Sequence, residues 1–190
     1  MAGPQRYIAA MIPTGTVTAE ELLRLDLPGK RAELVAGVLV VSEPPGYRHG
    51  EVAARLAKVL MDHIDARGLG RVLAAETGFK LASDPDTVRA PDVAFVRRER
   101  LPDPPPDGYA ELAPDLVVEV LSPGDPPGRV LAKIGDWLDA GAQLVWVVDP
   151  KRRQARVYRA DGRASLIPEA GVLDGEDVVP GFTCSLGAIF

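Results

Sequence analysis

The chain is poor in the residues that build disulfide frameworks and zinc clusters. Its 190 residues include one cysteine, Cys184, and two histidines. One cysteine excludes an internal disulfide, and so few sulfur and imidazole ligands argue against a zinc cluster. Both absences fit a protein of the reducing cytosol, so we expect a cytoplasmic location.

Long apolar runs are missing as well. No hydrophobic stretch approaches the roughly 18 residues of a membrane span, and the N-terminal residues lack a signal-peptide pattern. We therefore expect no contact with a membrane. Hydrophobic residues still make up 46% of the chain and charged residues 26%, which is ordinary for a globular protein and predicts a single domain over residues 1–190.

The chain has fewer basic than acidic residues. The formal net charge is −5, which counts against nucleic-acid binding through a broad basic surface. Two local clusters of basic residues remain, at residues 97–100 and 151–159. Such clusters are usually solvated surface, which is the simpler interpretation, and a local basic cleft is the alternative.

The chain does contain a regular alternation of helical and extended patterns. Thr18 and Glu21 fit a capping box for a helix over residues 19–25, and apolar spacing predicts further helices over 49–67 and 129–140. The expected strands cover residues 32–42 (a hairpin turning at Ala36-Gly37), 71–81, 92–96, 116–121, 144–148, 155–158, 165–167 and 178–182. The strand, helix and strand between residues 116 and 148 should form a right-handed parallel crossover, which indicates the α/β class.

Two carboxylates lie on short apolar strands of this pattern. Glu119 has apolar neighbours throughout residues 116–121, and Asp92 opens the apolar run 92–96. Desolvating an ionised carboxylate is costly unless it is paired or bound to a cation. Adjacent strands lie about 4.8 Å apart, so Asp92 and Glu119 can share one ion, whereas Asp115 lies ~13 Å from Glu119 along the same strand. Oxygen ligands without a nearby histidine or cysteine favour Mg²⁺ or Mn²⁺ over zinc.

Three other polar residues are ambiguous from the pattern alone. Lys133 lies on the edge of the apolar stripe of the helix over 129–140, from where it could reach the carboxylates, although a lysine lying over the helix shoulder is the simpler interpretation. Glu33 is typical of a surface residue at a strand edge. His49 opens a helix, where a structural role is the simpler interpretation and contact with a phosphate is the alternative.

Taken in order, these segments resemble a known superfamily. Pro91-Asp92, followed after 26 residues by Glu119-Val120-Leu121, is similar to the motif of the PD-(D/E)XK nucleases, which have the restriction-endonuclease-like fold. More specifically, the chain resembles the Uma-two family of predicted restriction endonucleases, a domain of unknown function. The matching stretches are AELVAGVLVVSEPPGYRHGEV, VRAPDVAFV, APDLVVEVLSPGD and the combination of Lys133 with AGAQLVWVVDP, from about residue 14 to 185.

The resemblance implies a mixed central β-sheet flanked by helices, with extra β-hairpins. It also implies that Asp92, Glu119 and the Val120 carbonyl hold Mg²⁺ or Mn²⁺, that Lys133 is catalytic, and that Glu33 is an auxiliary acid.

The chain departs from the superfamily motif at one position. Leu121 stands where the superfamily has its lysine, a loss for which Lys133 on the following helix would compensate. His49 matches a recurrent family histidine and is a possible auxiliary residue.

Three functions remain open at this point. The leading hypothesis is a magnesium-dependent DNA endonuclease, as a homodimer that cuts two strands. The second is a catalytically inactive nucleic-acid-binding or scaffold homologue on the same fold, which the acidic net charge and Leu121 favour. The third is a metal-dependent enzyme acting on RNA or another phosphodiester. No reader helix is recognisable, so the sequence names no target site.

Overall fold

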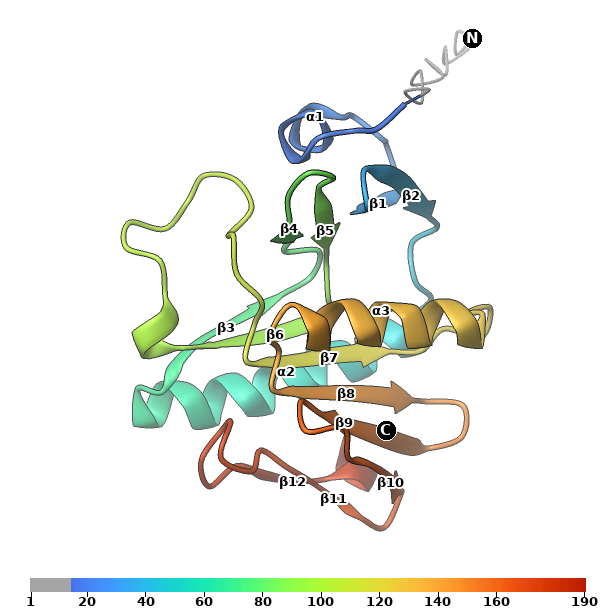
Figure 1. The fold of residues 1–190 in the computed structure, drawn as a ribbon. Helices are drawn as coiled ribbons and strands as arrows, with labels where there is room; N and C mark the ends of the chain where they lie inside the picture. The colour runs from blue at the N-terminus through green and yellow to red at the C-terminus, as the bar shows by residue number, and fades with distance from the viewer. Residues whose placement is uncertain (1–14) are drawn as a thin grey trace, which may run out of the picture.

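The computed structural model describes residues 15–190, so the start of the predicted domain lies outside the described part. A six-stranded mixed sheet lies at the centre, in the spatial order β10-β9-β8-β7-β6-β3 (Figure 1). Its strands are β3 (Gly70–Ala74), β6 (Val93–Arg97), β7 (Leu116–Val120), β8 (Leu144–Asp149), β9 (Gln154–Arg159) and β10 (Ala164–Pro168). β7 and β8 are parallel and are joined by helix α3 (Pro127–Asp139), which confirms the predicted crossover, and the other pairs are antiparallel.

The two long helices cover opposite faces of this sheet. Helix α2 (Tyr47–Arg67) packs Leu56 and other apolar residues into one core together with Val118. Helix α3 packs Trp137 into a second core together with Val117. Successive strand residues point to opposite faces, so Val118 faces α2 and Glu119, next in the chain, faces α3.

A second sheet of four strands, ordered β2-β1-β5-β4, lies over the α3 side of the molecule (Figure 1). It consists of β1 (Arg31–Val35), β2 (Val38–Ser42), β4 (Phe79–Ala82) and β5 (Thr87–Arg89). The predicted hairpin turn is confirmed at Ala36 and Gly37, whose φ angles of 49° and 74° suit a two-residue hairpin turn. The short helix α1 (Ala19–Arg24) begins with the predicted capping box, in which Thr18 and Glu21 bond reciprocally.

The C-terminal part adds a small hairpin and a helical turn. Strands β11 (Val172–Asp174) and β12 (Thr183–Ser185) pair antiparallel. Two 3₁₀ turns, η1 (Arg98–Arg100) and η2 (Leu186–Ala188), complete the described elements. No helix within residues 15–190 has the length and apolarity to cross a membrane.

Two strand predictions were wrong. Residues 71–81 form two strands, β3 and β4, which belong to different sheets, because the backbone turns between them at Ala75 and Glu76, where φ is 45° and 63°. Residues 178–182 form a hydrogen-bonded turn: Gly175 accepts the N–H groups of Val178 and Val179 through its carbonyl. The apolar character of this segment reflects its packing into the α2-side core.

Candidate active site

The sheet brings the two predicted carboxylates to one end. Val93 of β6 pairs with Val118 of the antiparallel neighbour β7. Because the two strands are antiparallel, Asp92, the residue before Val93, lies opposite Glu119, the residue after Val118. The two acids therefore lie on adjacent strands, as the strand spacing predicted.

Asp92 is buried and accepts three hydrogen bonds or ion pairs. Its Oδ2 accepts the backbone N–H of Val120 at 2.7 Å and lies 3.1 Å from Nε2 of His49. Its Oδ1 lies 3.1 Å from the guanidinium of Arg31. Burial would raise the pKa of Asp92, but His49, the Val120 N–H and Arg31 together hold it below its usual value. Asp92 is thus kept ionised, and His49 touches the site directly.

Lys133 reaches the carboxylate end of the sheet from α3. Its Nζ lies 2.9 Å from Oε1 of Glu119, 3.0 Å from Oε1 of Glu33 and 2.9 Å from the carbonyl oxygen of Ala90. The side chain is 20% exposed, so the simpler interpretation of a lysine lying over the helix shoulder was wrong. Burial would lower the pKa of Lys133, but Glu119 and Glu33 outweigh it and raise that pKa, so the ammonium stays charged.

Glu33 is part of the same cluster and not a surface residue at a strand edge. Its Oε1 accepts the N–H of Ala90 at 2.8 Å, and its Oε2 lies 2.9 Å from Arg89. Arg89 also donates to Asp136 of α3. Burial would raise the pKa of Glu33, but Lys133 and Arg89 lower it overall.

Glu119 is the acid whose charge is least compensated. Trp137 donates its indole N–H to Oε1 at 2.9 Å, and Lys133, which it shares with Glu33, is its cationic partner. Burial raises the pKa of Glu119, and the positive charge of Lys133 lowers it. Repulsion from Asp92 and Glu33 raises it further, so the pKa of Glu119 reaches about 7. This repulsion also shows that Asp92 and Glu119 lie within electrostatic reach of each other.

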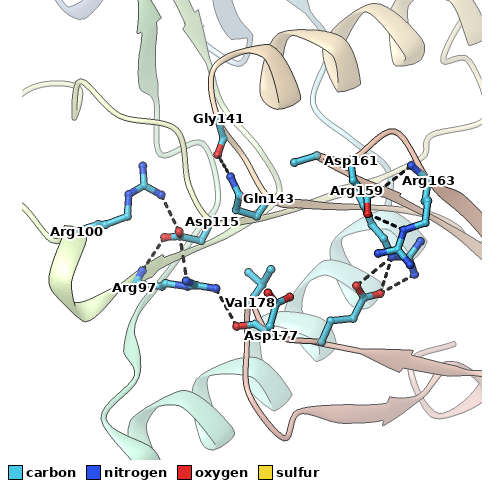
Figure 2. A pocket seen from close by; sticks show the side chains of 12 residues that line it. Arg97, Arg100, Asp115, Gly141, Gln143, Arg159, Asp161, Arg163, Asp177 and Val178 are labelled. Atoms are coloured by element: carbon cyan, nitrogen blue, oxygen red, sulfur yellow. Dashed lines mark hydrogen bonds and ion pairs between the residues drawn. The ribbon is translucent and has the colours of Figure 1, made fainter.

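The basic cluster at residues 97–100 lies at one end of the sheet, whereas the cluster at residues 151–159 extends from one end to the other. Arg97, Arg100 and Arg159 line an open pocket of about 420 Å³ at the end opposite to Glu119, where β7 and β8 begin (Figure 2). Its four arginines (97, 100, 159 and 163) face four acids (115, 161, 176 and 177), so the pocket carries no excess positive charge. The alternative of a basic cleft is therefore not met there. Lys151 and Arg152 lie in the turn after β8, at the Glu119 end.

Comparison with known proteins gives this arrangement a context. A family model described as "Putative restriction endonuclease", Uma2, matches residues 19–187. The chain belongs to the Uma2 family. A crystal structure described as "a putative nuclease belonging to DUF820", from Anabaena variabilis, is 20% identical in sequence and superposes with a TM-score of 0.80, covering 92% of this chain and 97% of that chain. A search of curated proteins returned no match.

The structural likeness shows that this Uma2 chain has the fold of that neighbour. The predicted α/β class, with a mixed sheet flanked by helices and additional hairpins, is confirmed. The family and the fold together support a nuclease.

The site of this Uma2 protein offers ligands suited to Mg²⁺ or Mn²⁺. Asp92 and Glu119 supply hard carboxylate oxygens, and mutual repulsion of two buried acids is what a divalent cation would relieve. The Val120 N–H donates to Asp92. The N–H and C=O of one strand residue point to the same side of the strand, so the Val120 carbonyl also faces Asp92. No three His, Cys, Asp or Glu side chains within residues 15–190 are arranged to hold an ion. Two carboxylates and a carbonyl would therefore bind the ion together with water molecules, as is usual for Mg²⁺.

Three residues of the site were missed by sequence reasoning. Arg31 binds Asp92, Arg89 bridges Glu33 to α3, and Trp137 donates to Glu119. Arg89 alone had a signal in the sequence, since it stands in an extended segment just before Pro91-Asp92. The contacts of Arg31 and Trp137 depend on which strands and helices meet, and no local pattern shows this.

Proposed function

We propose that this protein is a metal-dependent endonuclease that hydrolyses phosphodiester bonds in DNA. The observation that carries the proposal is that Lys133 of α3 reaches Glu119 while Asp92 lies opposite on the next strand. This arrangement supplies two carboxylates and an ammonium at one sheet end, although Leu121 occupies the superfamily lysine position.

Each residue has a chemical role in this proposal. Bound by Asp92, Glu119 and the Val120 carbonyl, Mg²⁺ or Mn²⁺ would supply Lewis acidity toward the phosphate and a lowered pKa for the attacking water. Lys133 keeps a charged ammonium beside Glu119, where it orients that water or offsets negative charge that develops on the phosphate.

The remaining contacts hold these groups in place. Glu33 fixes Lys133 and is itself fixed by Arg89, which ties the small sheet to α3 through Asp136. His49 and Arg31 keep Asp92 ionised and oriented. Preorganised charges of this kind need no rearrangement when the reaction begins.

Nicking of supercoiled plasmid tests the proposal. Wild-type protein should nick with Mg²⁺ or Mn²⁺ and not with chelator, and Glu119→Gln should lose the activity because one ligand charge is gone. RNA in place of DNA tests whether the sugar matters. Light scattering tests whether the protein is a homodimer, which two copies cutting opposite strands of a duplex would require.

A binding protein without cleavage activity is the second candidate. Leu121 at the superfamily lysine position is the observation in its favour. Binding of nucleic acid without metal-dependent cleavage, under conditions where the chain is folded, would make it the better description.

A further inference from the structure

The end of the sheet that holds Asp92 and Glu119 carries cations that no acid neutralises. Arg48 lies in the first turn of α2, next to His49, and Arg129 lies in the first turn of α3. Lys151 lies in the turn two residues after the end of β8, beyond the residue pair Val120 and Val148. All three are exposed, and none has an ion-pair partner within residues 15–190.

These three cations surround the site from both faces of the sheet. α2 covers one face, α3 covers the other, and the turn after β8 lies between them (Figure 1). The pocket at the opposite end of the sheet is lined by four arginines, but there four acids face them (Figure 2). The arginines of that pocket are thus offset by acids, whereas Arg48, Arg129 and Lys151 are not.

An exposed aromatic residue stands beside these cations. Tyr47, the first residue of α2, is 88% exposed, more than any other large hydrophobic side chain within the described chain. Folding of the monomer gives no reason for an aromatic ring there. Cations that follow a backbone together with an exposed ring on which a base can stack are the usual means of binding an unpaired nucleic-acid strand.

We propose that Arg48, Arg129 and Lys151 bind the phosphates on either side of the scissile one, and that Tyr47 stacks on an unpaired base of the same strand. We name this set the phosphate rim. It deepens the endonuclease function proposed above and rests on it for the scissile phosphate. It specifies a substrate whose strand is unpaired where it enters the site.

Binding measured without cleavage tests the rim separately from the activity. Fluorescence anisotropy of a labelled 12-nucleotide single strand, and of the duplex of the same sequence, is recorded in chelator at several salt concentrations. Wild type should bind the single strand more tightly. Each of Arg48→Ala, Arg129→Ala and Lys151→Ala should weaken binding and reduce the slope of log K against log salt by about 0.7.

Two matched variants sharpen the result. Arg67→Ala removes an exposed arginine from the other end of α2, ~28 Å from Arg48, and should leave affinity and slope unchanged. Tyr47→Ala should lose the preference for the single strand by at least about fivefold, whereas Tyr47→Phe keeps the ring and the preference.

The outcomes separate the rim from the endonuclease proposal. Binding that follows these expectations without any metal-dependent nicking would support the rim and overturn the enzyme. Nicking by wild type with unchanged salt slopes in all three cation variants would overturn the rim and leave the enzyme. A single strand bound no better than duplex, or equally well by Tyr47→Ala, would overturn the stacking role of Tyr47.

Discussion

Strand β7 has a buried acid at each end, and their surroundings differ. Asp115, just before the strand, accepts the N–H of Arg97 at 2.9 Å and pairs with Arg100 at 2.7 Å. Glu119, near the other end, shares a single ammonium with Glu33 and lies opposite Asp92. Asp115 thus has its own donors, whereas Glu119 must share its cationic partner with another acid.

The difference separates a structural acid from a reactive one. Asp115 is paired by its own donors and faces no second acid on the neighbouring strand, so no repulsion between acids is left there for a further cation to relieve. An acid that is buried among other acids keeps a raised pKa, here about 7 for Glu119, and gains from any cation that enters. Burial alone is therefore a poor guide to function, since Asp115 is as buried as the proposed ligands.

The largest expected effect concerns what packs under Glu119. Trp137 is fully buried, contacts Phe79 edge to face and donates to Glu119. Trp137→Ala should destabilise the protein by about 3–5 kcal/mol in urea unfolding. Trp137→Phe keeps an aromatic ring but loses the donor and part of the indole volume, so it should cost less, about 1–3 kcal/mol. Equal losses in the two variants would mean that the hydrogen bond, and not packing, dominates.

The next effect concerns the ammonium that Glu119 shares. Lys133→Ala should reduce cleavage by about 10²–10³-fold, because nothing would then orient the water or offset charge on the phosphate. Metal binding, followed by calorimetry, should persist through Asp92 and Glu119. Arg100→Ala, which removes a cation from Asp115 instead, should leave cleavage unchanged.

A compensating substitution tests the same ammonium. Leu121 lies two residues after Glu119, so both side chains point to the α3 face, and Leu121 packs against the α3-side core. Leu121→Lys in the Lys133→Ala background should restore part of the cleavage. If the double variant unfolds like its parent and cleavage is not restored, lysines at positions 121 and 133 do not reach the same point of the site.

The sequence pattern predicted the elements that carry the site, because each has a local signature. A continuous apolar run placed Glu119 inside a strand, helical spacing placed Lys133 on α3, and Thr18 with Glu21 marked the start of α1. The same reasoning failed for residues 71–81, where two extended segments were joined into one predicted strand although the backbone turns at Ala75 and Glu76 into another sheet.

Contacts between distant elements could not be predicted in this way. Glu33 is typical of a strand edge by pattern, and only the docking of the small sheet against α3 buries it beside Lys133. The family resemblance supplied the roles of Glu33 and Lys133, and the geometry brings both residues to Glu119 as that resemblance implied.

A third effect is the pH dependence of stability. The folded pKa of Glu119 is raised from 4.5 to about 7, so the protonated acid stabilises the folded state below pH 4.5, and this is lost as pH rises through 7. Asp92 and Glu33 have lowered pKa values, so they affect stability in the opposite sense. Their contribution to the stability of the folded protein is lost only as the pH falls further. Between pH 4.5 and 7, wild type should therefore lose stability relative to Glu119→Gln, by at most about 3 kcal/mol. Denaturant titrations across this window measure the difference, and parallel curves for the two proteins would contradict it.

Metal binding should follow the same titration. The ionised carboxylate is the ligand, so a proton on Glu119 competes with Mg²⁺. The apparent affinity should rise by up to about tenfold per pH unit below pH 7 and level off above it. An affinity that is flat from pH 5 to 8 would show that Glu119 is not a ligand.

The smallest effect is expected at the opposite end of the sheet. Arg159 pairs with Glu176 at 2.6 Å, and the two side chains are 18% and 28% exposed. Arg159→Met keeps the apolar stem and should cost about 1 kcal/mol or less, since water and salt screen a pair that is only partly buried. The difference in unfolding free energy should shrink further between 0.05 and 0.5 M salt, about a threefold fall in screening length. Nicking should be unchanged, because the pocket lies at the far end of β7 from Glu119. A tenfold loss of nicking in a variant that remains folded would show that the pocket takes part in the reaction, and the contrast between the two ends of the strand would then fail.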